Sequence, residues 1–169
     1  MLTVIKSYHQ LDLSQLFRVY QQSIQAAAAE NYRRCATNEG ILNAQQDFYG
    51  YLRDFLSDTD TMYALWTVDG VYKAALRLEP YLDGLLLSGL ETAPDARCCG
   101  FASALMKATL EYVGGHSGDT VYSHVNKENA ISLAVHAKCG FRRLSDFANY
   151  IDGSVALSAC TLIFDDYKK

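Results

Sequence analysis

Three apolar runs in the middle of the chain constrain its fold more than any other feature. They occupy residues 62–68, 71–78 and 85–92, and Asp69-Gly70 and Asp83-Gly84 separate them. Both positions of an Asp-Gly pair tolerate positive φ, which a two-residue hairpin turn requires. We therefore predict three consecutive antiparallel strands.

The flanking segments show helical and strand patterns in turn. We expect strands at residues 2–7, 120–125, from 141 and at 155–164, helices at about 12–30, 41–56, 99–113 and 129–139, and a polar loop at 31–40. Asp12 and Gln15 have the spacing of an N-terminal cap. Gly114-Gly115 is expected to end the third helix, and Gly140 to supply a left-handed cap to the fourth.

Length and composition exclude several classes of protein. With 169 residues, of which 50% are hydrophobic and 20% charged, the chain has the size and balance of a single globular domain, residues 1–169. No apolar run approaches the ~20 residues that cross a bilayer, and the first residues lack the pattern of a secretory signal. A net charge of -4 without a basic stretch argues against nucleic-acid binding. We expect a cytoplasmic protein with no nucleic-acid or membrane partner.

The cysteines do not follow a metal-binding pattern. They are irregularly spaced and lack the paired Cys-x-x-Cys ligands of a zinc site. The five residues are Cys35, Cys98, Cys99, Cys139 and Cys160. We therefore expect reduced thiols and no metal site.

The junction between the third strand and the following helix carries the first functional pattern. The chain passes from Pro94 through Arg97-Cys98-Cys99-Gly100-Phe101-Ala102 into the helix. Small side chains at Gly100 and Ala102 let a ligand lie against the backbone, and the first amides of a helix lack partners and attract anions. The pattern predicts a pyrophosphate site, and a plain strand-to-helix turn is the alternative.

A polar stripe on the helix at 129–139 is the second functional pattern. Asn129, Ser132 and His136 lie at i, i+3 and i+7, on one helical face. Apolar residues occupy most of the other positions, namely Ala130, Ile131, Leu133, Ala134 and Val135. This arrangement favours a largely buried helix whose polar stripe lines a cleft.

Together, these two segments resemble the GNAT acetyltransferases. Residues 97–102 match the (Gln/Arg)-x-x-Gly-x-(Gly/Ala) loop of that family, and residues 129–141 match its asparagine-helix-Gly-Phe segment at the same spacing. The resemblance implies an α/β (α+β) GNAT fold. Its central sheet would be mixed and mostly antiparallel, with about seven strands and about four flanking helices, and strands four and five would splay apart.

The resemblance also implies acetyl-CoA as the cofactor. The backbone of residues 90–92 would pair with the pantetheine arm, the amides of residues 98–103 would hold the pyrophosphate, and the helix from residue 129 would contact the cofactor. The expected cofactor-binding residues are Leu90, Glu91, Thr92, Arg97, Cys98, Cys99, Gly100, Phe101, Ala102, Ser103, Asn129 and Ser132. Cys98 and Cys99 depart from the Gly and the Lys or Gln common in such loops, which removes a side-chain cation.

In this family an acceptor amine attacks the thioester directly in a ternary complex. Many members carry a tyrosine general acid four residues before the Gly-Phe pair, and His136 stands there in this chain. It is either that acid or a structural histidine near a helix end. His124 lies where the ribosomal-protein-type N-acetyltransferases have a glutamate base, and Glu91 and Tyr122 are rival bases.

The acceptor would be a small-molecule or peptide amine, which the sequence does not select further. Oligomeric state stays open, with a homodimer as the commonest assembly. Two other functions also stay open. One is a catalytically silent acyl-CoA-binding module, and the other is a thiol enzyme in which Cys98 or Cys99 is the nucleophile and His124 or His136 its base.

Overall fold

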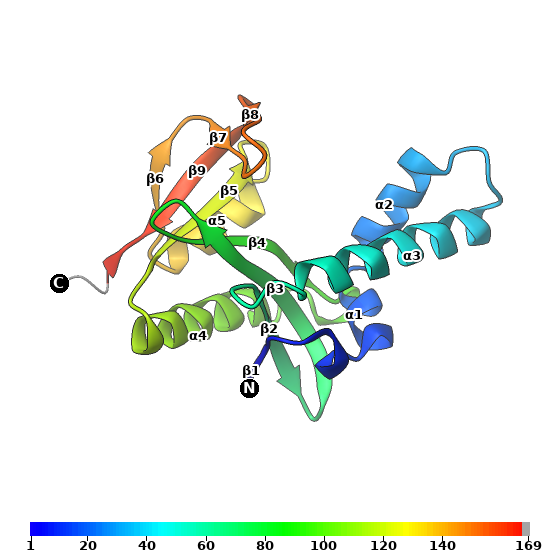
Figure 1. Ribbon diagram of the computed structural model, residues 1–169, viewed down its shortest axis with the longest axis horizontal. Coiled ribbons are helices and arrows are strands. Elements are labelled where there is room, and N and C mark those ends of the chain that lie inside the picture. The colour runs from blue at the N-terminus through cyan, green and yellow to red at the C-terminus, as the bar shows by residue number, and fades with distance from the viewer. Residues whose placement is uncertain (167–169) are drawn as a thin grey trace.

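The computed structural model describes residues 1–166, in which a mixed sheet lies between two groups of helices (Figure 1). In chain order the elements are β1 (Leu2–Ile5), α1 (Leu13–Val19), α2 (Gln21–Asn31), α3 (Thr37–Phe55), β2 (Met62–Val68), β3 (Val71–Tyr81), β4 (Gly84–Thr92), α4 (Phe101–His116), β5 (Thr120–Asn126), α5 (Ala130–Lys138), β6 (Arg142–Ser145), β7 (Ala148–Asn149), β8 (Val155–Ala156) and β9 (Ala159–Phe164), with 3-10 turns at Tyr8–Gln10 and Pro94–Ala96.

The described part of the sheet has seven strands in the order β1-β2-β3-β4-β5-β9-β6. Its neighbours are antiparallel except β4 and β5, which run parallel, and β7 and β8 form a separate hairpin. The predicted mixed, mostly antiparallel sheet is therefore confirmed.

The two predicted hairpins differ in how they turn. Asp69 and Gly70 have φ of 50° and 76°, as an Asp-Gly turn requires. The second turn lies one residue earlier than predicted, because Leu82 has φ 51° and β4 already begins at Gly84. Gly84 serves another purpose, since a Cβ at this position would lie 2.0 Å from the carbonyl oxygen of Thr120. The glycine therefore allows β5 to approach β4 closely.

Hydrophobic clusters cover both faces of the sheet. Helices α1 to α3 pack on one face, where Leu16, Leu52 and Tyr63 are fully buried. Helix α4 packs on the other face, where Leu76 and Leu105 are fully buried. Each such side chain contributes about 1.5–3 kcal/mol to folding, so the two clusters hold the helices in place on opposite sides of the strands.

Several element boundaries differ from those expected, and α3 already begins at Thr37, inside the predicted loop. The first predicted helix breaks at Tyr20 (φ -89°, ψ 17°) into α1 and α2, so the described chain has five α-helices instead of about four. Helix α4 continues through Gly114 and Gly115 to His116, since each interior glycine costs only about 1 kcal/mol. A turn at residues 157–158 divides the last predicted strand into β8 and β9.

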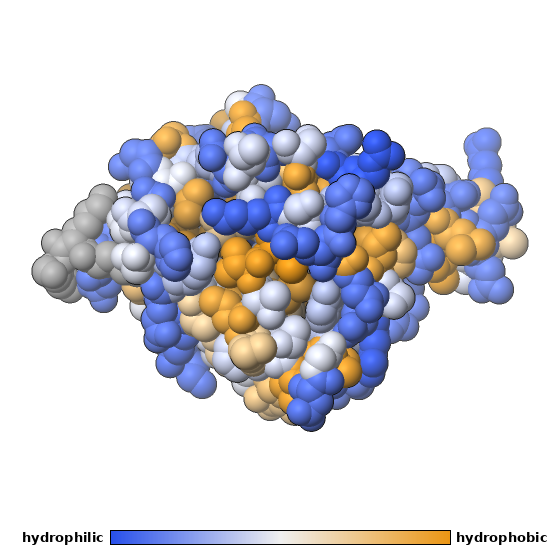
Figure 2. Space-filling model, turned by 60° about the horizontal axis from the view of Figure 1, so that its bottom comes forward, coloured by the Kyte–Doolittle hydropathy of each residue, from blue (hydrophilic) through white to orange (hydrophobic). Residues whose placement is uncertain are grey.

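Helices α2 and α3 lie side by side and project away from the sheet (Figure 1). In a second view, the projecting part formed by α2 and α3 has hydrophilic residues around hydrophobic ones (Figure 2). Hydrophobic residues also gather in the middle of the face seen in this view. Within residues 1–166 no helix combines the length and apolar character needed to cross a membrane.

Candidate functional site

Strands β4 and β5 separate at the centre of the sheet. They pair from Gly84 with Thr120 as far as Leu87 with Ser123. Beyond that point β4 continues to Thr92 paired only with β3, and β5 continues paired with β9. The facing edges of the two strands are therefore free of each other at their carboxyl ends, and the predicted splay is confirmed.

The loop at residues 97–103 brings an uncapped helix terminus to this gap. Gly100 is the N-cap of α4, has φ 80° and provides no side chain, and the first turn holds no acidic residue. The amide groups of this turn are therefore available to a ligand. A Cβ on Gly100 would meet nothing within 4 Å, so the backbone faces open space. These features fit a bound pyrophosphate.

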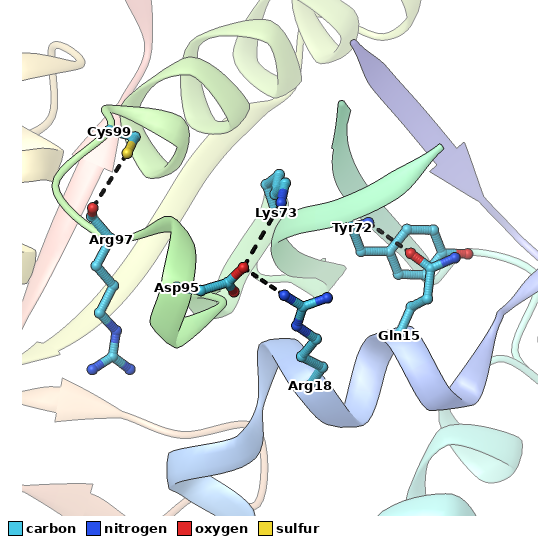
Figure 3. Close-up of polar contacts among 7 residues, drawn as sticks. All are labelled: Gln15, Arg18, Tyr72, Lys73, Asp95, Arg97 and Cys99. Atoms are coloured by element: carbon cyan, nitrogen blue, oxygen red, sulfur yellow. Dashed lines mark hydrogen bonds and ion pairs between the residues drawn. The ribbon is translucent and has the colours of Figure 1, made fainter. Parts of the chain in front are cut away.

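Polar contacts anchor the segment that leads into this loop (Figure 3). Asp95 accepts a 2.5 Å hydrogen bond from Arg18 of α1 and lies 3.9 Å from the ammonium of Lys73. The guanidinium of Arg97 points away from this cluster, and the Cys99 thiol donates to the carbonyl oxygen of Arg97 at 3.4 Å. The loop is thus tied to α1 while its only charged side chain, Arg97, is exposed.

Helix α5 is more exposed than its apolar sequence suggests. Ile131 is 81% exposed, and Ala130 and Ala134 are also on the surface. The expectation of a largely buried helix was therefore wrong, because only one side of α5 packs against the sheet. The side chain of Asn129 accepts a hydrogen bond from the amide of Ser132 at 3.0 Å and so caps the helix.

His136 is buried on the packed side of α5. Its Nδ1 lies 2.8 Å from the carbonyl oxygen of Ser132, so Nδ1 carries the proton and donates it. Nε2 then accepts from the hydroxyl of Ser123 on β5, 3.0 Å away. Burial lowers the pKa of His136, which favours the neutral ring. With 2% exposure and both nitrogens paired, this histidine connects α5 to β5.

Tyr122 and Glu91, the rival bases, occupy different surroundings. The hydroxyl of Tyr122 donates to Asp83 at 2.6 Å, and this bond raises the pKa of Tyr122 to about 12. Glu91 is partly buried and accepts a hydrogen bond from Ser23 of α2. Burial raises the pKa of Glu91, while Ser23 and Arg97 oppose that effect. Tyr122 thus lies in the paired half of β5, whereas Glu91 lies beyond the point where the strands separate.

His124 is the first residue of β5 after its last pair with β4. The hydroxyl of Thr161 donates to the carbonyl oxygen of Phe147 at 2.8 Å, so it accepts from Nδ1 of His124, 3.2 Å away. Nε2 therefore carries the lone pair, and it is buried without a hydrogen-bond partner in the described chain. Burial lowers the pKa of His124, and a hydrogen bond that the ring donates to the backbone carbonyl of Asn149 opposes this. The ring lies edge-on to Tyr150, 5.3 Å away.

The surroundings of the two exposed thiols bear on the thiol-enzyme alternative. Cys98 and Cys99 are exposed and free. His124 instead bonds to a hydroxyl group on β9, and His136 bonds to one on β5. No hydrogen bond within residues 1–166 links either histidine to either of these cysteines. The described geometry therefore contains no paired thiol and base.

Arg77 of β3 is a residue that sequence reasoning missed. Its guanidinium carbon lies 4.8 Å from the ring centroid of Tyr51 and 6.0 Å from that of Phe55, both on α3. Gly89 lies against it with φ 59°, and a Cβ there would be 2.9 Å from Arg77 Nε. The hydroxyl of Tyr20 donates to the Gly89 carbonyl oxygen at 2.6 Å. A single charge in the otherwise apolar run 74–78 was the signal that could have revealed this site.

Comparison with known proteins agrees with this geometry. The model of the acetyltransferase (GNAT) family matches residues 18–141, which is most of the chain. The chain belongs to the GNAT acetyltransferase family. A comparison with curated proteins found no match. The family match includes the loop at 97–103 and all of α5, but it ends before β7, β8 and β9. The hairpin that contacts His124 thus lies outside the matched part of this GNAT protein.

Solved structures show the same GNAT fold. The ribosomal-protein-S18-alanine N-acetyltransferase from Escherichia coli is 18% identical, with a TM-score of 0.62 over 97% of this chain and 93% of that one. PaiA N-acetyltransferase from Thermoplasma acidophilum, solved in complex with coenzyme A, is 15% identical, with a TM-score of 0.64 over 98% and 99%. A GNAT acetyltransferase from Bacillus anthracis is 14% identical, with a TM-score of 0.68 over 99% and 96%.

Proposed function

We propose that this protein transfers an acetyl group from acetyl-CoA to a primary amine of a small molecule or a peptide N-terminus. Membership of the GNAT family supports acetyl transfer. The observation that carries the proposal is the uncapped start of α4 at Gly100, next to the gap between β4 and β5. Coenzyme A in the Thermoplasma structure of the same fold supports the choice of donor.

The chain offers groups for each part of acetyl-CoA. The amides of residues 98–103 would hold the pyrophosphate, because a helix N-terminus attracts negative charge. The free edge of β4 at residues 90–92 would pair with the pantetheine amides, and Asn129 and Ser132 at the start of α5 would contact the cofactor. Acetyl-CoA supplies a thioester: the amine nitrogen bonds to the acetyl carbon, the carbon-sulfur bond breaks, and the sulfur leaves as thiolate.

We assign acceptance of the amine proton to Nε2 of His124. This nitrogen carries an unpaired lone pair beside the strand gap, and its lowered pKa keeps the ring neutral near pH 7. An arriving amine would satisfy this buried acceptor. His136 has both nitrogens paired, and the Tyr122 hydroxyl is held by Asp83, so neither is as well suited to accept a proton. Glu91 is the alternative base.

A turnover screen tests the proposal. Acetyl-CoA should be consumed, with release of free thiol, in the presence of at least one member of a panel of small amines and peptides. The E. coli structure is named as an enzyme acting on an alanine of ribosomal protein S18, so alanine-initiated peptides belong in the panel. Acetyl-CoA should also raise the melting temperature, since it binds only the folded protein. A thermal shift without any turnover would favour the silent binding module, and no shift at millimolar concentration would contradict the proposed donor.

Two substitutions test the base. His124→Phe keeps a planar ring against Tyr150 but removes both nitrogens, and kcat should fall by roughly 10²- to 10⁴-fold. Glu91→Gln is the comparison and should retain most of the rate. If Glu91→Gln loses the rate and His124→Phe keeps it, the base is Glu91.

A further inference from the structure

Four neighbouring strands each place one unpaired polar atom on the same face of the sheet. Within residues 1–166, five buried side-chain nitrogen or oxygen atoms lack a hydrogen-bond partner, and the fifth, on Thr109, lies on α4. The four on the sheet are Tyr63 Oη, Arg77 Nε, Ser88 Oγ and His124 Nε2, on β2, β3, β4 and β5. We call these four residues the polar row.

Strand register aligns the polar row across the sheet. Tyr63 pairs with Arg77, and Arg77 pairs with Ser88, so these three side chains share one face. Ser88 and His124 directly follow the last pair between β4 and β5, Leu87 with Ser123. The row therefore ends at the gap where the strands separate.

Buried polar groups are normally hydrogen-bonded to protein, water or a ligand, so four such atoms on one face indicate a place where polar molecules can bind. Tyr63 lies beside Tyr20 and Arg77, and Ser88 lies beside Glu79, without hydrogen bonds of ordinary geometry. Aromatic side chains lie against two members of the row. Tyr51 of α3 lies against Arg77, and Tyr150 lies against His124. Polar atoms of a ligand would supply the missing partners.

Arg77 determines the charge that such a ligand carries. Within the described chain its guanidinium forms no hydrogen bond of ordinary geometry and no ion pair, although the rings of Tyr51 and Phe55 hold it in place. A fixed planar guanidinium with free N–H groups suits a carboxylate, which it can bind through two parallel hydrogen bonds. Glu79 and Glu91 lie near enough to interact with Arg77 electrostatically. The same face therefore offers negative charge to an ammonium group.

We infer that the polar row is the acceptor subsite and that the acceptor is a free amino acid, an amine that also carries a carboxylate. Arg77 binds the carboxylate, and His124 receives the proton of the amine. Neighbouring paired strands lie about 4.8 Å apart, so the backbones of β3 and β5 are roughly 10 Å apart where β4 still pairs with both. A ligand between the long side chain of Arg77 and the ring of His124 could contact both. This inference rests on the proposed acetyl transfer.

Matched pairs of acceptors test the inference. L-phenylalanine, L-histidine and L-lysine are compared with their decarboxylated counterparts 2-phenylethylamine, histamine and cadaverine, with kcat and KM measured for each. For at least one pair, kcat/KM for the amino acid should exceed that for the amine by roughly 10- to 100-fold, mainly through KM. The methyl ester of the preferred amino acid should lose that advantage, because esterification removes the carboxylate charge.

Variants of Arg77 connect the preference to this side chain. Arg77→Gln should remove most of the preference, Arg77→Lys should keep part of it, and Arg34→Gln, which changes an exposed arginine between α2 and α3, should keep all of it. The inference is overturned if amines and esters are used as well as amino acids, if only peptides are used, or if Arg77→Gln retains the preference. If Arg77→Gln does not fold, the ester comparison on the unaltered protein decides. Failure of the proposed function would give a different result from failure of this inference, because no amine or peptide would then be acetylated.

Discussion

Replacing His136 with phenylalanine distinguishes a structural histidine from a catalytic one. The change keeps a planar ring of similar size against Phe141, whose ring lies edge-on at 5.0 Å. It removes both nitrogens and therefore breaks the hydrogen bonds to Ser132 and Ser123. We expect lower stability with a turnover number close to that of the unaltered protein.

The magnitude follows from the two lost partners. The Ser123 hydroxyl is 3% exposed and would be left without an acceptor, which costs about 1–3 kcal/mol. The Ser132 carbonyl keeps the hydrogen bond of its own helix, so its loss is smaller, about 0.5–1.5 kcal/mol. A total of about 1.5–4.5 kcal/mol should lower the melting temperature by roughly 3–18 °C, since each kcal/mol shifts a domain of this size by about 2–4 °C.

The assay combines urea unfolding with turnover below the melting temperature, normalised to the folded fraction. Ser123→Ala in the His136→Phe background should recover stability, because it removes the unpaired hydroxyl, and the double-mutant cycle measures that coupling. The reasoning is refuted if the maximal rate drops by roughly two orders of magnitude while the melting temperature stays within about 2 °C of the unaltered protein. His136 would then be the proton donor that its place in the sequence suggests.

Replacing His136 with phenylalanine should also change how the free energy of unfolding depends on pH, in a direction that can be stated. Burial lowers the folded-state pKa of His136 below its ordinary value of 6.5, so below about pH 6.5 the unfolded chain binds the proton more readily. The stabilising contribution of the neutral ring is complete above that pH and is lost as the pH falls toward the folded pKa. From about pH 7.5 to about pH 5.5 the unaltered protein should therefore lose more free energy of unfolding than His136→Phe does. His124 has the same sign but is present in both proteins.

Two pairs of glycine substitutions test the site further. Gly100→Val and Gly118→Val place a β-branched residue at similar positive φ, where neither Cβ meets an atom within 4 Å, so each should cost about 1–2 kcal/mol. Only Gly100→Val should abolish the thermal shift with acetyl-CoA, and retention of that shift would contradict the pyrophosphate site. Gly89→Ala should destabilise the protein by at least about 1 kcal/mol and weaken catalysis, because its Cβ would press on Arg77. Gly50→Ala, in open space on α3, should stabilise it by about 0.5–1 kcal/mol, and equal melting temperatures for these two variants would contradict the close contact between Gly89 and Arg77.

Features controlled by short stretches of backbone could be predicted from the sequence. Asp12 caps α1 through the amide of Gln15 at 3.1 Å, as the spacing of the two residues predicted. Gly140 has φ 94° and Gly100 has φ 80°, because only glycine adopts such angles without steric cost. The order of the elements and the family resemblance followed from the same local patterns.

Other features depended on packing between distant segments. Tyr20 interrupts a continuous helical pattern because its buried side chain reaches the carbonyl oxygen of Gly89, 69 residues away. Helix α4 passes through two glycines because packing against the sheet outweighs their weak propensity. The exposure of Ile131 likewise shows that an apolar sequence does not decide how much of a helix is covered.

The candidate site depends both on local sequence patterns and on packing between distant segments. Spacing along the chain identified the loop at 97–103, whose backbone conformation is local. The sequence offered His136 as an acid or a structural residue and His124 as a base, and the structure pairs both nitrogens of His136 but leaves one nitrogen of His124 unpaired. The polar row could not be predicted, since strand register alone brings Tyr63 and Arg77 into line with Ser88 and His124. A shift of one residue in any strand would turn its side chain to the opposite face, and only tertiary packing selects the register.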